Sequence, residues 1–139
     1  MSNSMTLTAR TDGASKGNPG PAAYGFTVEK DGIVLEENYG YIGETTNNIA
    51  EYTACIEALK RMKSLGATRV VMFSDSELMV RQLNGLYRVK NRGLQPLYRT
   101  VQKLLGSFDS YEIVHVLRGE NTVADGLANK AINEHLSRK

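Results

Sequence analysis

The sequence has one cysteine, Cys55, and no run of 18 apolar residues. A lone cysteine excludes a disulfide framework and fits a cytoplasmic setting. Without a long apolar run we expect no membrane span, and the N-terminal "MSNSMTLTAR" lacks the charged and apolar regions of a secretory signal. Cys55 lies in an amphipathic segment, which favours a small buried side chain over a thiol nucleophile. We expect a cytoplasmic monomer with a single domain, residues 1–139.

The net charge is only +2, but the charged side chains are unevenly distributed along the sequence. Cationic side chains gather between residues 81 and 103, a window without Asp or Glu. They are Arg81, Arg88, Lys90, Arg92, Arg99 and Lys103. Two interpretations remain open at this point. The window is either a solvated helix face or a surface that contacts phosphates.

Hydrophobic periodicity predicts an α/β fold. Strands are expected over residues 5–14, in a hairpin over 24–43 that turns at Asp31 and Gly32, over 68–75 and over 110–117. Helices are expected over 47–67, 76–85, 94–105 and 122–136. In the last helix we expect Val123, Leu127, Ala131 and Leu136 to face inward. The hairpin strands should be antiparallel and the later crossovers parallel. This gives a mixed five-stranded sheet, three strands antiparallel and two parallel, flanked by helices.

Four acidic residues occupy the ends of predicted strands or the first turns of predicted helices: Asp12, Glu51, Asp75 and Asp125. Strand ends and helix starts can meet at one rim of an α/β sheet. Carboxylates gathered there would repel one another unless a hard divalent cation, Mg²⁺ or Mn²⁺, offset the repulsion. Taken singly, each acid also has an ordinary explanation as a helix cap or a turn residue.

The glycine-rich segment "RTDGASKGNPGPAAYG" suggests a phosphate-binding loop at first sight. The spacing of Gly13, Gly17 and Gly20 does not fit a dinucleotide fingerprint, and no Gly-Lys-Ser/Thr follows. Pro19 and Pro21 also remove two backbone amide donors. A tight turn between two strands fits better, with glycines that let another backbone approach closely.

Four segments together resemble ribonuclease H type 1. They are "TDGASKGNPGPAAYG", "TTNNIAEYTA", "SDSELMVRQLNG" and "HVLRGENTVADGLANKA", and each contains one of the four acids. The resemblance implies an endonuclease that cleaves the RNA strand of RNA–DNA hybrids and leaves a 3′-hydroxyl and a 5′-phosphate. It also implies two Mg²⁺ ions, or Mn²⁺, held by Asp12, Glu51, Asp75 and Asp125 as metal-binding and catalytic residues.

The resemblance further implies a set of substrate contacts. Asn18 and Thr46 would hold a phosphate of the DNA strand, and Asn47 and Asn48 would reach minor-groove edges and ribose hydroxyls. The 2′-hydroxyl is the group that distinguishes RNA from DNA. The backbone near Gly13 and Ser15 would face the RNA strand.

The chain also departs from many bacterial relatives. Its "LYRVKNRGL" segment is short and it has no Trp, so it resembles a compact form that lacks the basic protrusion. Arg118 stands in the loop where longer relatives carry a mobile histidine, and we count it among the catalytic candidates. Glu77 replaces a glutamine that contacts substrate in many relatives. His115 lies within a predicted strand, where packing is favoured over catalysis.

Alternative functions remain at this point. Another nuclease of the same fold superfamily and a non-catalytic nucleic-acid-binding module are both compatible with the pattern. Double-stranded RNA is a further candidate substrate. The "TTNN" run favours ribonuclease H, because its side chains can read hydroxyl groups, and the presence of all four acids argues against a pure binder.

Overall fold

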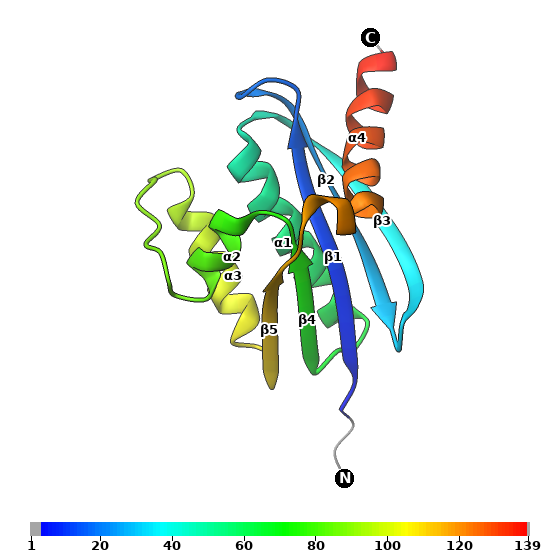
Figure 1. The fold of residues 1–139 in the computed structure, drawn as a ribbon, viewed down its shortest axis with the longest axis vertical. Coiled ribbons are helices and arrows are strands. Elements are labelled where there is room, and N and C mark those ends of the chain that lie inside the picture. The colour runs from blue at the N-terminus through cyan, green and yellow to red at the C-terminus, as the bar shows by residue number, and fades with distance from the viewer. Residues whose placement is uncertain (1–3, 139) are drawn as a thin grey trace.

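A computed structural model describes residues 4–138 of the chain (Figure 1). It contains a five-stranded sheet in the order β3-β2-β1-β4-β5. The strands are β1 (Thr6–Ser15), β2 (Gly20–Lys30), β3 (Ile33–Thr45), β4 (Arg69–Ser74) and β5 (Ser110–His115). β1, β2 and β3 pair antiparallel, whereas β4 pairs parallel with both β1 and β5. The predicted mixed sheet is confirmed, although β2 begins at Gly20 rather than at Tyr24.

The helices are α1 (Asn47–Ser64), α2 (Glu77–Leu83), α3 (Gln95–Leu105) and α4 (Thr122–Ser137), with a short 3₁₀ turn, Arg118–Glu120, before α4. The α1 helix packs on β1 and β2 with α3 beside it, while α4 packs on β1, β2 and β3. In Figure 1 α1 lies behind the sheet and α4 in front of it. Within residues 4–138, none of the helices has the length and apolarity that a bilayer crossing needs.

The main core fills the space between the sheet and α1 and α3. Leu59 and Met62 of α1, Met72 of β4 and Val101 of α3 are fully buried there. Cys55 is also buried in this cluster, as the sequence predicted. Burial of such side chains stabilises the fold by roughly 1.5–3 kcal/mol each.

The α4 helix packs through small residues, which corrects one prediction. Val123 was expected to face inward, but it is half exposed, and Ala124 and Ala128 face the sheet instead. The reason is Gly25 on β2. A Cβ atom at Gly25 would lie 2.6 Å from the carbonyl oxygen of Ala124 and from the amide nitrogen of Ala128. The backbone of α4 at Ala124 and Ala128 therefore lies so close to β2 that position 25 has no room for a side chain.

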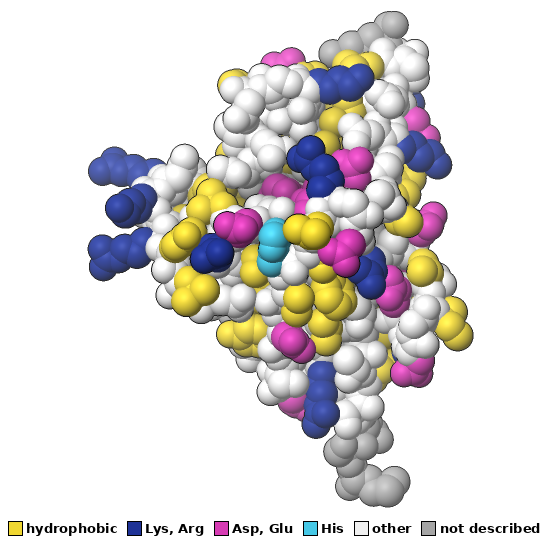
Figure 2. Space-filling model, viewed as in Figure 1, with side chains coloured by type: hydrophobic (Ala, Val, Ile, Leu, Met, Phe, Trp, Pro, Cys, Tyr) yellow, Lys and Arg dark blue, Asp and Glu magenta, His cyan; other side chains and the backbone are white. Residues whose placement is uncertain are grey.

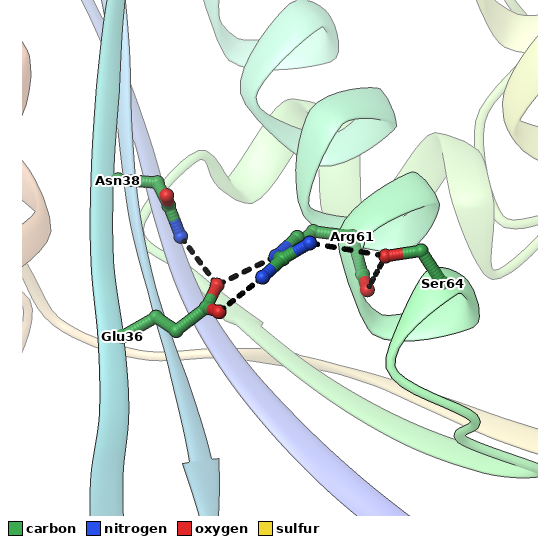
Figure 3. A network of polar contacts seen from close by, with 4 residues as sticks. All are labelled: Glu36, Asn38, Arg61 and Ser64. Atoms are coloured by element: carbon green, nitrogen blue, oxygen red, sulfur yellow. Dashed lines mark hydrogen bonds and ion pairs between the residues drawn. The ribbon is translucent and has the colours of Figure 1, made fainter.

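A polar network ties the end of α1 to β3 (Figure 3). The Arg61 guanidinium donates two hydrogen bonds to the carboxylate of Glu36, and Asn38 and Ser64 complete the group. The hydrogen bond from Arg61 lowers the pKa of Glu36 to about 2. Because both side chains are partly exposed, solvent screens the pair and weakens its contribution to stability. The pair links the C-terminal part of α1 to β3, and the opposite end of α1 carries Glu51.

Candidate active site

The candidate site forms where β1 runs past the end of β4. The pairing of β4 with β1 stops at Thr11, opposite Ser74. Beyond that point two side chains from other elements bond the backbone of β1. The Gly13 amide donates to Glu51 Oε1 at 2.6 Å, and the Thr11 carbonyl accepts from Asn121 Nδ2 at 2.8 Å. Asp12 lies between these two anchored residues, so α1 and the start of α4 are held on either side of it.

Three of the four predicted acids meet at this point. A carboxylate oxygen of Asp12, one of Glu51 and one of Asp75 lie within 4.8 Å of one another. Asp12 and Glu51 are each only 5% exposed, and Asp75 is half-buried at the end of β4. Asp125, half-buried in the first turn of α4, lies outside this group but close enough to Asp12 to interact with its carboxyl group.

Helix capping does not explain these acids. The hydroxyl of Thr46 caps α1 by accepting from the Ile49 amide, and the hydroxyl of Ser76 caps α2 by accepting from the Met79 amide. Glu51 lies one turn further along α1, with its carboxylate turned to Gly13. The capping roles that the sequence left open for Glu51 and Asp75 are therefore filled by their neighbours.

Burial and mutual repulsion disfavour the ionised forms of the two buried acids. Desolvation is the largest cause of the raised pKa of Asp12, followed by the charges of Glu51 and Asp75. Desolvation likewise raises the pKa of Glu51, and the Gly13 amide opposes that rise in part. Among the described residues, no ion pair involves Asp12, Glu51 or Asp75.

These properties fit a divalent cation. The donors are all carboxylate oxygens, which suit Mg²⁺ or Mn²⁺ rather than zinc. A bound cation would favour the charged forms that burial disfavours. Asp12, Glu51 and Asp75 would provide the ligands, and Asp125 would join them from α4.

The raised pKa values predict how stability depends on pH without metal. Above their ordinary pKa values of 3.8 and 4.5, Asp12 and Glu51 keep protons in the folded state that the unfolded chain has lost. The free energy of unfolding should therefore fall as pH rises from about 4, by at most about 1.4 kcal/mol per pH unit for each group. Urea denaturation at pH 5 and pH 8 in EDTA measures this fall.

Two comparisons isolate the acids from other titrating groups. Mg²⁺ should raise the free energy of unfolding more at pH 8 than at pH 5, because it replaces protons that are bound at the lower pH. Asp12→Asn should flatten the metal-free pH dependence. An unchanged slope in this variant would show that Asp12 ionises normally.

The predicted substrate-contacting residues lie along one rim beside the acids. The side-chain oxygen of Asn18, in the turn between β1 and β2, accepts from the Asn47 amide at 3.0 Å. This bond joins the turn to the start of α1, where Thr46 is the cap and Asn47 and Asn48 are exposed. Ser15 is half-buried at the end of β1. The structure thus brings Asn18, Thr46, Asn47 and Asn48 together.

The loop before α4 carries the remaining candidate. Arg118 is exposed, and its charge lowers the pKa of Glu51, so it lies within electrostatic reach of the acids.

His115 is exposed rather than packed, which corrects the sequence prediction. It is the last residue of β5, which is an edge strand of the sheet. Glu77 pairs with Arg81 at 3.3 Å on α2.

Asn121 is a site residue that the sequence reasoning missed. It is 1% exposed, and its amide nitrogen bonds the Thr11 carbonyl across a separation of 110 residues. Its backbone carbonyl accepts from the Asp125 amide at 3.1 Å. Asn121 therefore links Asp125 to the strand that carries Asp12. In the sequence, only its position four residues before Asp125 could have indicated that Asn121 belongs to the site.

Comparisons with known proteins agree with this geometry. A family model described as reverse transcriptase-like matches residues 10–131. A bifunctional protein of Mycobacterium tuberculosis is 41% identical over 131 residues, covering 93% of this chain and 36% of that protein. This chain thus spans about a third of the length of these mycobacterial relatives. A ribonuclease H of Coxiella burnetii is 35% identical over 144 residues, covering 91% of this chain and 90% of that protein.

Solved structures show the same likeness. The N-terminal RNase H domain of that Mycobacterium tuberculosis protein superposes with a TM-score of 0.92 and 39% identity, covering 97% of this chain and 99% of that one. LC11-RNase H1, solved in complex with an RNA/DNA hybrid, superposes with a TM-score of 0.89 and 38% identity, covering 94% and 99%. Because the family model spans most of the chain and the Coxiella relative matches nearly throughout, this chain belongs to the ribonuclease H family of hydrolases.

Proposed function

We propose that this chain is an endoribonuclease that cleaves the RNA strand of RNA–DNA hybrids with two divalent metal ions, and leaves a 3′-hydroxyl and a 5′-phosphate. The observation that carries the proposal is the group formed by the buried Asp12 and Glu51 with the half-buried Asp75, which within the described residues form no ion pair. The hybrid complex of LC11-RNase H1, a close structural neighbour, supports the choice of substrate.

In this proposal Asp12, Glu51, Asp75 and Asp125 hold Mg²⁺ or Mn²⁺. When bound, two such ions activate a water molecule and stabilise the departing 3′-oxygen. The protein fixes its carboxylates before substrate arrives, since Gly13 anchors Glu51 and Asn121 anchors the start of α4. This pre-organisation keeps the acids in position during the reaction.

The rim beside the acids supplies selectivity for the hybrid. In this proposal Asn18 and Thr46 contact a phosphate of the DNA strand, and Asn47 and Asn48 contact the minor groove. Gly13 and Ser15 line the path of the RNA strand. Neutral amide and hydroxyl groups can both donate and accept hydrogen bonds, which suits recognition of ribose hydroxyls.

Matched duplexes test the proposal. Labelled RNA–DNA, RNA–RNA and DNA–DNA duplexes of one sequence are incubated with the protein in EDTA, Mg²⁺ or Mn²⁺. We expect cleavage of the RNA strand of the hybrid only when a metal is present, with 3′-hydroxyl ends. Binding without cleavage in either metal would instead identify a non-catalytic binding module. Cleavage of RNA–RNA would add double-stranded RNA to the substrates.

Arg118→Ala should lower the turnover number of hybrid cleavage by about tenfold and leave KM nearly unchanged. The reason is that Arg118 lies near Glu51 rather than on the asparagine rim, so its charge acts on the reacting phosphate or its release. Steady-state kinetics check this. Arg118→Lys keeps a charge and should recover part of the rate, whereas Arg138→Ala, an exposed arginine after α4, is the matched control. Unchanged kinetics in Arg118→Ala would make it an ordinary loop cation.

A further inference from the structure

A basic cleft lies beside the connection between α2 and α3, away from the acids. It has a volume of about 830 Å³, and its lining includes Tyr87, Arg88, Lys90, Tyr98 and Arg99. The sequence contains no Asp or Glu between residues 78 and 108, so no acid of its own segment offsets these charges. Figure 2 shows Lys and Arg side chains projecting from this connection on the face where acidic side chains gather near the centre. Nothing in the proposed cleavage chemistry uses the cleft.

The connection is held in place at both ends. The amides of Leu86 and Tyr87 donate to the Arg81 carbonyl, at 2.8 and 3.3 Å. At the other end Asn91 accepts from the Gly93 and Leu94 amides at 2.7 and 3.3 Å.

Between these anchors one residue points inward. Val89 packs against the main core, and its carbonyl accepts from Gln95 Nε2 at 3.2 Å. Because Val89 faces inward, its neighbours Arg88 and Lys90 are directed to solvent, and both are exposed. The cations are therefore presented by an anchored backbone.

Exposed aromatic and apolar groups accompany the cations. Tyr87 is 49% exposed and Leu86 is 67% exposed. The Arg81 guanidinium carbon lies 5.4 Å from the centre of the Tyr87 ring, which orients the ring through a cation–π contact. Contacts to duplex phosphates need no exposed aromatic ring. A cationic groove with an exposed ring is instead the combination that binds single-stranded nucleic acid, because unpaired bases can stack.

One short helix separates the cleft from the acids. Asp75 immediately precedes the cap of α2, and α2 has only seven residues, which span about 10 Å. We propose that the basic cleft binds a single-stranded extension of the nucleic acid whose duplex part lies at the acidic site. This inference rests on the proposed function. The cleft would favour hybrids that continue into an unpaired strand over blunt ones.

Fluorescence anisotropy in EDTA tests this without cleavage. The probes are a blunt RNA–DNA hybrid, the same hybrid with an oligothymidine tail, and the tail alone. The tail should tighten binding about tenfold, which corresponds to one stacked base together with phosphate contacts. The variant Arg88→Ala/Lys90→Ala/Arg99→Ala should remove that gain and lower the salt-dependence slope by about two. Tyr87→Ala should remove part of the gain, and Tyr87→Phe should keep it.

The matched control is Lys30→Ala/Lys60→Ala/Lys63→Ala, which removes the same charge from other surfaces and should preserve the gain. Two results would overturn the proposal: no gain from the tail in the unmodified protein, or an equal loss for blunt and tailed hybrids in the cleft variant. Binding of the tail alone distinguishes a failure of this inference from a failure of the proposed function. Its binding should weaken in the cleft variant even if hybrids prove not to be substrates.

Discussion

Asp12→Asn is expected to abolish cleavage of RNA–DNA hybrids while the fold survives. The substitution keeps the shape of the side chain but removes one of the three clustered carboxylates that would hold the metal. A neutral amide is a poor ligand for a divalent ion, and losing several kcal/mol of transition-state stabilisation lowers the rate by about a thousandfold or more. Single-turnover cleavage of a labelled hybrid measures the loss, and circular dichroism checks the fold.

Asp75→Asn should behave in the same way, since Asp75 belongs to the same group. Asp109→Asn is the matched control, because Asp109 is an exposed acid between α3 and β5. Asp12→Asn should also be at least as stable as the unmodified protein at pH 8 without metal, since asparagine does not have to take up a proton on folding as the buried carboxylate does. Normal turnover by Asp12→Asn or Asp75→Asn would refute the metal-site assignment.

Gly13→Ala is expected to lower the free energy of unfolding by about 3–5 kcal/mol and to abolish activity. A Cβ atom at this position would lie 2.2 Å from the carbonyl carbon of Ala50 and 2.3 Å from the amide nitrogen of Glu51. The α1 helix would have to move away from β1, which combines an overpacking cost with loss of the charge-assisted hydrogen bond from Gly13 to Glu51. Urea denaturation measures the change.

Gly126→Ala provides the control for this prediction. Gly126 lies inside α4, and an added Cβ atom would meet nothing within 4 Å. Alanine is a better helix former, so this variant should be as stable as the unmodified protein or more stable by up to about 1 kcal/mol. If Gly13→Ala is as stable as Gly126→Ala, then β1 and α1 are not in the close contact described here.

Local patterns were sufficient to predict most of the elements. The alternation in β1, the Asp31 and Gly32 turn, and the helical spacing of Tyr52, Ile56 and Leu59 depend only on neighbours in the chain. Connection rules then restrict the topology to a mixed sheet. The same rules placed Asp12, Asp75 and Asp125 near one rim, because the ends of strands and the starts of helices converge there.

Contacts between distant segments were decided by the tertiary structure. The bond from Gly13 to Glu51 spans 38 residues, and that from Asn121 to Thr11 spans 110. Both arise because β4 stops pairing at Thr11 and leaves backbone groups of β1 to be satisfied by side chains. The inward face of α4 depended in the same way on Gly25, in another strand.

The chemical groups of this protein can thus be read from its sequence: its carboxylates, its asparagine rim and its basic connection between α2 and α3. The burial of Asp12 and Glu51 beside Asp75, and the raised pKa values of Asp12 and Glu51, depend on how the separate elements pack together. The physical reason is that burial and electrostatic coupling depend on distances between side chains from separate elements. Periodicity and turn signals describe each element but do not contain those distances.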